Sequence, residues 1–137
     1  MSTLRIHAVS FALFATASFF AGCAATTSMT GKVIQGGVGF VGVVDATDER
    51  FKSDGVAGVK VTVTKNPQEG GMRIGEATTD AKGNFNVVIS DQSALIRPAG
   101  IAASGPGYQP ASGVMNIPPK AQRVLIIVRP AGSSGTR

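Results

Sequence analysis

The sequence contains few of the residue types that most catalytic and metal sites require. Its 137 residues include one cysteine, one histidine, one tyrosine and no tryptophan, and only 15% are charged. A single cysteine, Cys23, cannot form an intrachain disulfide. Zinc sites use cysteine and histidine in nearly all cases, so the chain lacks the ligands for one. The 18 glycines and 7 prolines, by contrast, indicate short strands separated by many turns.

The first 22 residues have the pattern of a secretion signal. A basic end with Arg5 is followed by an apolar run over residues 8–21, which is too short for the roughly 20 residues that cross a bilayer. Cleavage after residue 22 removes the only histidine, His7. Ser-His-Asp and Cys-His sites need a histidine to move the proton. We therefore expect no catalytic site in the mature chain.

Cys23 follows this signal in a context that resembles the lipobox of bacterial lipoproteins. The segment Phe20-Ala-Gly-Cys23 places two small residues before the cysteine. The resemblance implies cleavage at Cys23 and two or three acyl chains on it, which anchor far more stably than one. Ala24, in place of aspartate, implies sorting to the outer membrane in enteric-type bacteria. Residues 23–30 are small and polar and predict a lipidated tether.

The alternative is an ordinary secretory signal that is cut near Ala21 or Ala25. In either case only Arg5 is lost from the 13 basic residues, which leaves 12 against 8 acidic residues. A mildly basic charge that is scattered along the chain does not indicate a nucleic-acid partner.

From Gly31 onward, apolar residues recur with a period of two, which is typical of strands with one buried face. The clearest examples are residues 59–63 and 85–89, while residues 123–129 are apolar on both faces and predict a central strand. Further candidates are Val33–Val44, which contains four glycines, Met72–Thr79, Ile96–Ser104 and Gly113–Ile117. Together they predict an all-β, seven-stranded antiparallel β-sandwich over residues 31–130, followed by a disordered tail at residues 131–137.

Three segments give this sandwich a family resemblance. They are Gly55-Val-Ala-Gly-Val-Lys-Val-Thr-Val63, Glu76-Ala-Thr-Thr-Asp-Ala-Lys-Gly-Asn-Phe85 and Gly107-Tyr108. The segments are similar to the carboxypeptidase regulatory-like family, and the similarity covers residues 40–129. It implies a transthyretin-like, or prealbumin-like, seven-stranded sandwich. That family is defined by its fold more than by an activity, so the resemblance implies little chemistry.

The most specific part of the resemblance is a hairpin built from Thr79, Asp80, Gly83 and Phe85. Asp80 can bond to the backbone of its own turn, Gly83 can take a positive φ, and Phe85 returns the chain to the core. Calcium takes six to eight oxygens, which Asp80 alone does not supply. Glu76 and Asp80 could form a carboxylate pair for glycoside hydrolysis, but two acids beside a turn favour a structural role.

The longest segment without periodicity, Asp45–Gly58, is the candidate recognition loop. Its four acidic residues could bind calcium if the loop folded back on itself; they are Asp45, Asp48, Glu49 and Asp54. Arg50 and Lys52 lie among these acids, and the spacing is not that of an EF-hand, so local ion pairs are the simpler expectation.

The aromatic residues bear on a second hypothesis, carbohydrate binding, because sugar-binding sandwiches usually present aromatic rings. Phe40 and Phe85 fall in strand patterns and are expected in the core. Phe51, in the candidate recognition loop, is the one aromatic that we expect to be exposed. If Phe51 is buried, the carbohydrate hypothesis loses its only platform.

We therefore expect a lipid-anchored protein of the bacterial cell envelope, with Cys23 as the lipidation site and neither a cofactor nor a metal. The expected role is a non-catalytic structural or protein-interaction module, whose partners are the membrane and an envelope protein. The alternative is a module that binds cell-wall or surface glycan.

Overall fold

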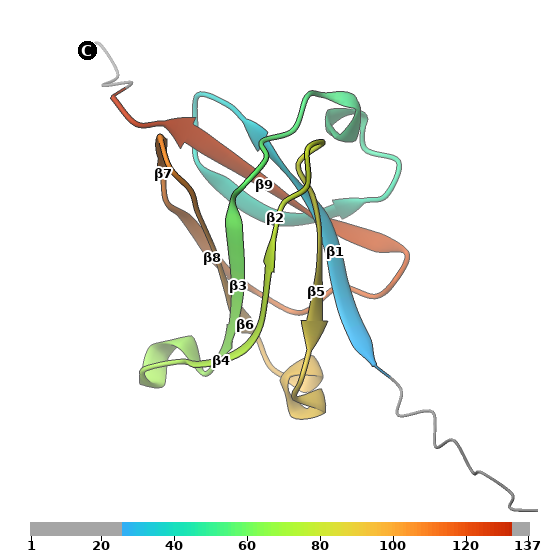
Figure 1. Ribbon diagram of the computed structural model, residues 1–137. Helices are drawn as coiled ribbons and strands as arrows, with labels where there is room; N and C mark the ends of the chain where they lie inside the picture. The colour runs from blue at the N-terminus through green and yellow to red at the C-terminus, as the bar shows by residue number, and fades with distance from the viewer. Residues whose placement is uncertain (1–25, 133–137) are drawn as a thin grey trace, which may run out of the picture.

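The computed structural model describes residues 26–132, which form nine β-strands and three short 3-10 helices (Figure 1). In chain order the elements are β1 (Thr27–Gln35), β2 (Phe40–Asp45), η1 (Glu49–Lys52), β3 (Lys60–Lys65), η2 (Pro67–Glu69), β4 (Met72–Thr78), β5 (Asn84–Ile89), η3 (Gln92–Ile96), β6 (Ala99–Ser104), β7 (Tyr108–Gln109), β8 (Ala111–Met115) and β9 (Gln122–Pro130). The predicted signal segment, Cys23 and residues 133–137 lie outside the described residues.

The strands form two sheets that pack face to face in a sandwich-like arrangement (Figure 1). One sheet has five strands in the order β2-β9-β1-β5, with the short β7 paired to the end of β9. The other has four strands in the order β4-β3-β6-β8. The all-β prediction is confirmed, and no α-helix is present in residues 26–132. Nor does any helix in that range have the length and apolar character needed to cross a membrane.

The period-two segments of the sequence supply the core between the two sheets. Val61 and Val63 on β3 are fully buried, and so is Val87 on β5. Phe85 and Ile89, on the same face of β5 as Val87, are also buried. These residues belong to one cluster that extends from β1 to β9. The alternation read from the sequence therefore identifies the buried faces of β3 and β5.

β9 is the central strand that residues 123–129 predict. It lies between β1 and β2, and Val124, Leu125 and Ile126 are all fully buried. Val124 and Ile126 belong to the main core, whereas Leu125 points to the opposite face of the sheet. A covering layer must therefore lie over that outer face as well.

The predicted single strand Val33–Val44 is two strands, β1 and β2, which lie on opposite sides of β9. The chain turns between them at residues 36–39, where three of the four glycines are found. Because β1 and β2 run in opposite directions, β9 must be parallel to one of them, and it pairs in parallel with β1. The sandwich is therefore not wholly antiparallel, and its described strands number nine instead of about seven.

β1 also begins earlier than the sequence indicates. Residues 27–30, assigned to the tether, pair with β5, and Met29 is only 1% exposed. The segment contains a single large apolar residue, so no alternation is visible in it. Three residues therefore lie between Cys23 and the start of β1 in the sequence.

Ile96 belongs to η3 and not to a strand, because η3 occupies residues 92–96 and β6 starts only at Ala99. The Asp91 carboxylate caps η3 by accepting a hydrogen bond of 2.9 Å from the Ser93 amide. Pro98 then favours an extended conformation at Arg97, which has ψ 152°. The helix therefore cannot continue, and the chain enters β6.

The two ends of the sandwich carry different segments (Figure 1). The upper end, here called the η1 end, contains residues 36–39, 46–59 and 79–83. The lower end, here called the η3 end, contains the start of β1, η2, η3 and residues 116–121. The described chain therefore begins at the η3 end, and the candidate recognition loop lies at the opposite one.

Candidate functional site

Three of the four acidic residues of the candidate recognition loop are engaged by their own neighbours. Asp45 accepts hydrogen bonds from the amide and the hydroxyl of Thr47, at 2.9 and 2.7 Å. These bonds stabilise the carboxylate and lower the pKa of Asp45. Asp48 caps η1 and accepts bonds from the backbone amide and the guanidinium of Arg50, at 2.8 to 2.9 Å. This engagement lowers the pKa of Asp48 to about 2.

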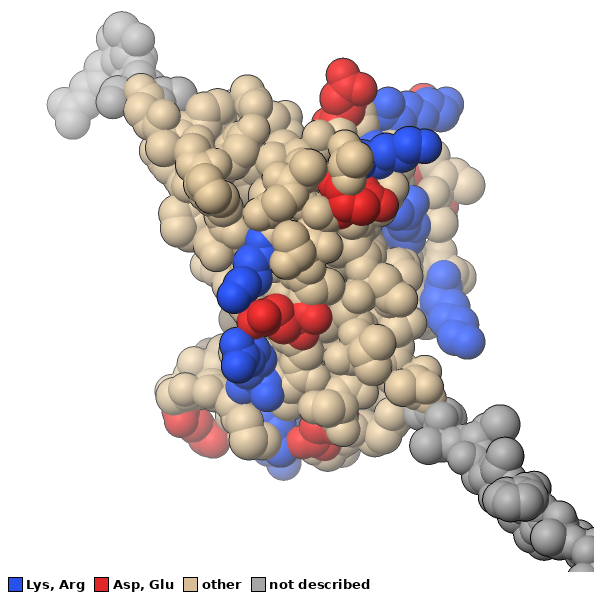
Figure 2. Space-filling model, in the orientation of Figure 1, with Lys and Arg blue, Asp and Glu red and all other residues tan. Residues whose placement is uncertain are grey.

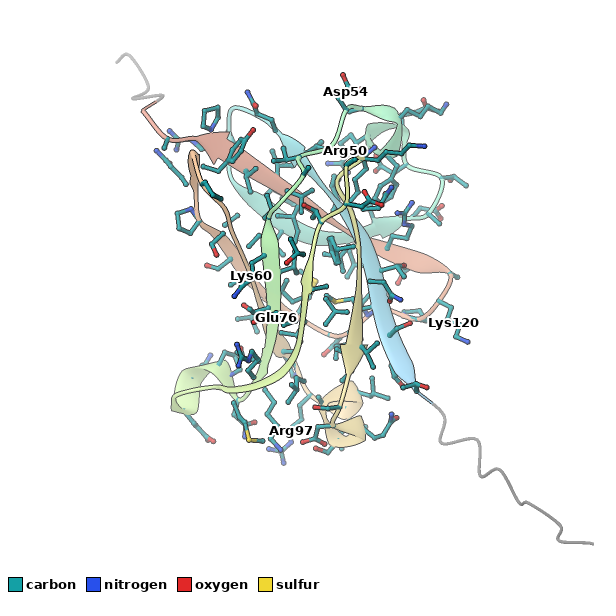
Figure 3. The ribbon with its side chains drawn as sticks, in the orientation of Figure 1. Arg50, Asp54, Lys60, Glu76, Arg97 and Lys120 are labelled. Atoms are coloured by element: carbon teal, nitrogen blue, oxygen red, sulfur yellow. The ribbon has the colours of Figure 1, made fainter. Side chains whose placement is uncertain are left out.

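The four acids do not converge on a common point. Glu49 pairs with Lys52 across one helical turn, at 2.8 Å, and Asp54 projects from the top of the molecule (Figure 3). Within residues 26–132 there is no group of three histidine, cysteine or acidic residues that could hold a metal ion. The geometry is that of a loop with local ion pairs, and it offers no support for the calcium alternative.

Phe51 lies at the centre of η1 and is fixed to the outer face of the five-stranded sheet. Its carbonyl oxygen accepts a 2.9 Å hydrogen bond from Nζ of Lys32, a β1 side chain that is only 8% exposed. The Arg123 guanidinium, from β9, lies over the ring with Cζ 4.3 Å from the centroid. Phe51 is therefore half-buried, with one ring face covered by Arg123. It does not provide the open platform that the sequence suggests.

Phe40 is the aromatic that is exposed, against the expectation that it lies in the core. Val41 and Val43 on β2 stand opposite Ile126 and Val124, so they face the core and Phe40 faces outward. The ring lies along its own strand over Gly42, where a Cβ would come within 2.4 Å of it. Phe40 remains 39% exposed, and Arg50 of η1 lies 5.8 Å from its centroid.

Alternation along the strands predicts the face on which Phe40 and Lys32 lie, although residue type alone suggests the wrong exposure for each. Both belong to strands in which the neighbouring positions carry the apolar core residues. Strict alternation therefore assigns Phe40 and Lys32 to the outer face. A phenylalanine in a strand suggests burial, and a lysine suggests exposure, yet each takes the opposite environment here.

The other side of the candidate recognition loop is held by the hairpin motif. The buried hydroxyl of Thr79 donates to the carbonyl of Val56, at 2.6 Å, and accepts from the amide of Val59, at 2.9 Å. Asp80 closes the turn by accepting 2.9 Å bonds from the amides of Lys82 and Asn84. These bonds tie the end of the loop to the turn between β4 and β5.

A close backbone contact completes the attachment. Gly83 has φ +77°, and its amide donates to the Asp80 carbonyl at 3.0 Å. Its carbonyl accepts from the amide of Val33 on β1. Gly55 packs against the same turn so closely that a Cβ on it would lie 1.9 Å from the Lys82 carbonyl oxygen. The loop, β1 and the turn therefore form one assembly.

A hollow of about 410 Å³ lies where these segments meet. Its lining includes three lysines and one carboxylate: Lys32, Lys52, Lys82 and Asp54, together with Ser53, Gly55 and Ala81. Figure 2 shows charged side chains gathered at the upper right, over the region of η1. The lining has three lysines against one carboxylate, but the Lys52 ammonium is paired with Glu49 and the Lys32 ammonium donates to the Phe51 carbonyl. The net positive charge of the lining favours an anionic group.

The carboxylates considered for glycoside hydrolysis have other partners. Glu76 pairs with Arg73, at 2.7 Å, and with Lys60, at 3.6 Å, on the surface of the four-stranded sheet (Figure 3). Asp80 serves its own turn, as described above. The candidate site is therefore the surface formed by η1, the exposed ring of Phe40 and the lysine-lined hollow, here called the η1 surface. Comparisons of the chain with protein-family models, with curated proteins and with solved structures found no match.

Proposed function

We propose that this chain is an envelope lipoprotein, anchored through Cys23, whose β-sandwich is a non-catalytic structural or protein-interaction module. We also propose that the sandwich is of the transthyretin-like type, on the strength of the segments that resemble the carboxypeptidase regulatory-like family. The proposed location is the bacterial cell envelope, at the outer membrane where two membranes are present. The proposed partner is a protein that binds the η1 surface.

The observation that carries this proposal is the position of the η1 surface. The described chain begins with Thr26 at the η3 end, and the η1 surface lies at the opposite end (Figure 1). An anchor attached a few residues before Thr26 would therefore direct the η1 surface away from the membrane. This is the arrangement that an accessory protein needs in order to reach a partner.

The chemistry of the η1 surface supports binding to a protein. Phe40 offers an exposed aromatic ring, and the net positive lining of the hollow favours an acidic group. η1 lies between the two, since Arg50 Cζ is 5.8 Å from the centroid of the Phe40 ring and Lys52 lines the hollow. Aromatic and arginine side chains in a preorganised loop are typical of the residues that dominate binding energy at interfaces. The partner that fits presents an apolar side chain beside a carboxylate.

The carbohydrate alternative rests on a different residue than the sequence suggests. Arg123 covers one face of Phe51, so the ring is not free to stack on a sugar. Phe40 is exposed, but it stands alone, whereas Tyr108 is half-buried and lies on β7. A single ring gives weak support to glycan binding, and the protein-interaction role is the better proposal.

The test is photo-cross-linking in living cells from the full-length chain. p-Benzoylphenylalanine replaces Phe40 or Asp54 on the η1 surface, or Val114, which is 58% exposed on the four-stranded sheet. We expect one dominant protein adduct from positions 40 and 54 and none from position 114. In the chain with the probe at position 54, Phe40→Ala should lower the adduct yield at least roughly fivefold. The control is Val88→Ala, which shortens another exposed side chain of the five-stranded sheet that contains Phe40. It should leave the yield unchanged.

Other results would count against the proposal. Adducts of wall glycan alone from position 40 would favour the carbohydrate alternative. Equal adducts from all three positions would contradict a defined interaction surface.

A further inference from the structure

The η3 end carries the most exposed large apolar side chain among the described residues. Ile96, the last residue of η3, is 82% exposed, and its neighbour Leu95 is 37% exposed. An isoleucine on the surface of a β-sandwich is unremarkable when it stands alone. Here it is adjacent to a second apolar residue and to the point at which the described chain begins.

The start of β1 and η3 are in direct contact. The Thr27 hydroxyl donates to the Gln92 amide oxygen at 3.2 Å. A hollow of about 390 Å³ is lined by Thr26, Thr27 and Ser28 on one side and by Leu95 on another, and residues 117–120 complete it. The exposed residues of η3 therefore lie beside the first residues of β1.

The length of chain before β1 fixes how far this end can be from the lipid. Thr27 is the fourth residue after Cys23, and even a fully extended chain spans at most about 14 Å over these four steps. Acyl chains on Cys23 would thus hold the η3 end close to the bilayer. A longer tether would place no such limit on the distance between the sandwich and the bilayer.

The charged residues around Leu95 and Ile96 are of both signs: Asp91, which caps η3, is paired with Lys65, and Glu69 lines a neighbouring hollow with Arg97. The basic residues that would face a phospholipid surface are Arg97 and Lys120. Arg97 follows Ile96 directly, and both line a hollow of about 280 Å³ beside Pro98. Lys120 lines the hollow that contains Leu95. Figure 3 labels Arg97 at the lower edge of the molecule and Lys120 on its right side, at about the level of Glu76. Basic side chains beside exposed apolar ones are typical of segments that lie in the interface of an anionic membrane.

We propose that η3 is a membrane-docking element: Leu95 and Ile96 insert into the interfacial layer of the bilayer that holds the Cys23 lipid. Arg97 and Lys120 contact the phosphate groups of the same leaflet. The sandwich then stands with its η3 end on the membrane and its η1 surface facing away. This inference rests on the lipid anchor of the proposed function.

Cysteine labelling tests the docking directly, because Cys23 is the only cysteine in the sequence and its sulfur is occupied in the lipidated chain. Ile96→Cys receives the environment-sensitive fluorophore NBD. The matched control is Val38→Cys, which places the label at a residue that is 74% exposed at the η1 end. Both lipidated proteins are reconstituted in vesicles of phosphatidylcholine and phosphatidylglycerol that contain nitroxide-labelled lipid.

We expect the emission from position 96 to shift to the blue and to be quenched at least about twofold by the nitroxide lipid, since an interfacial segment lies about 5–10 Å deep. Position 38 should show neither effect. Replacing Arg97 and Lys120 by glutamine should remove the dependence of the quenching on phosphatidylglycerol.

Three results would overturn the proposal, each in a distinguishable way. Emission from position 96 that matches position 38, on a chain with lipid on Cys23, would contradict docking but leave the anchor intact. A blue shift without quenching would indicate that a second protein copy covers Ile96. A second NBD label on an unlipidated Cys23 would contradict the anchor and the docking together.

Discussion

Gly83 and Gly58 are two residues of the η1 end at which a side chain would strain the backbone. Both have positive φ, +77° and +73°. A Cβ on Gly83 would lie 2.5 Å from the Val33 carbonyl oxygen and 2.6 Å from the Gly55 Cα, whereas a Cβ on Gly58 would meet nothing within 4 Å. The two positions therefore separate backbone strain from steric conflict.

We predict that Gly58→Ala lowers the free energy of unfolding by about 1–2 kcal/mol, the cost of a left-handed conformation. Gly83→Ala should lower the free energy of unfolding by roughly 1–3 kcal/mol more than Gly58→Ala. Its methyl group would clash with backbone atoms, which cannot move aside as the end of a long side chain can. Urea unfolding of the two variants and the wild type measures the difference. Equal midpoints for the two variants would show that the turn does not pack on β1 and Gly55 as described.

At the same scale, the sequence predicted residues whose role is local. Asp80 bonds to the amides of Lys82 and Asn84 in its own turn, and turn chemistry of this kind is visible in a motif. Thr79 instead bonds to Val56 and Val59, 23 and 20 residues away, and no local motif predicts these partners. Alternation predicts that Phe40 and Lys32 lie on the outer face of the sheet. It does not predict how exposed each side chain is, because that depends on the layer that covers this face. That layer is η1, which contacts β1 and β9 only in the folded chain.

Among the elements, η1 depends on the charge of the carboxylate that caps it. The bonds from Arg50 lower the pKa of Asp48 from 3.8 to about 2. A carboxyl group whose pKa is lower in the folded state stabilises the fold above its unfolded pKa. That stabilisation is lost as the pH falls through the folded value. Asp91, which caps η3 and pairs with Lys65, also has its pKa lowered to about 2.

We predict that the stability of the wild type falls between about pH 4 and pH 2 as these two carboxylates take up protons. Asp48→Asn and Asp91→Asn should each remove part of this dependence, and the double variant should remove the most. Thermal unfolding followed by circular dichroism across this pH range is the measurement. Asp54→Asn, at an acid that caps no helix, is the control. A double variant with the same slope as the wild type would contradict the assigned role of both caps.

The elements that could be predicted from sequence are those with a clear pattern along the chain. β3 and β5 alternate, and β9 is apolar on both faces, so the core and the central strand follow from periodicity. The division of Val33–Val44 into β1 and β2 could not be predicted, because both parts are apolar and rich in glycine. The parallel pairing of β1 with β9 is a property of topology that no local pattern encodes.

For the molecule as a whole, the important feature is the opposition of its two ends. The start of β1, four residues after Cys23 in the sequence, is at the η3 end, and the engaged loop, Phe40 and the lysine-lined hollow are at the η1 end. Attachment at one end and recognition at the other give a consistent account of an envelope-anchored module. The proposed interaction surface rests on geometry, whereas the proposed anchor rests on the sequence of the first 23 residues.

The most direct test of this account is the intact mass and N-terminal peptide of the mature protein purified from the membrane fraction. The account predicts a chain that begins at Cys23 and carries a diacylglycerol on its sulfur, with the modification absent and the protein unprocessed or released in Cys23→Ala. A mature chain that begins elsewhere, such as near Ala21 or Ala25, and carries no lipid would contradict it.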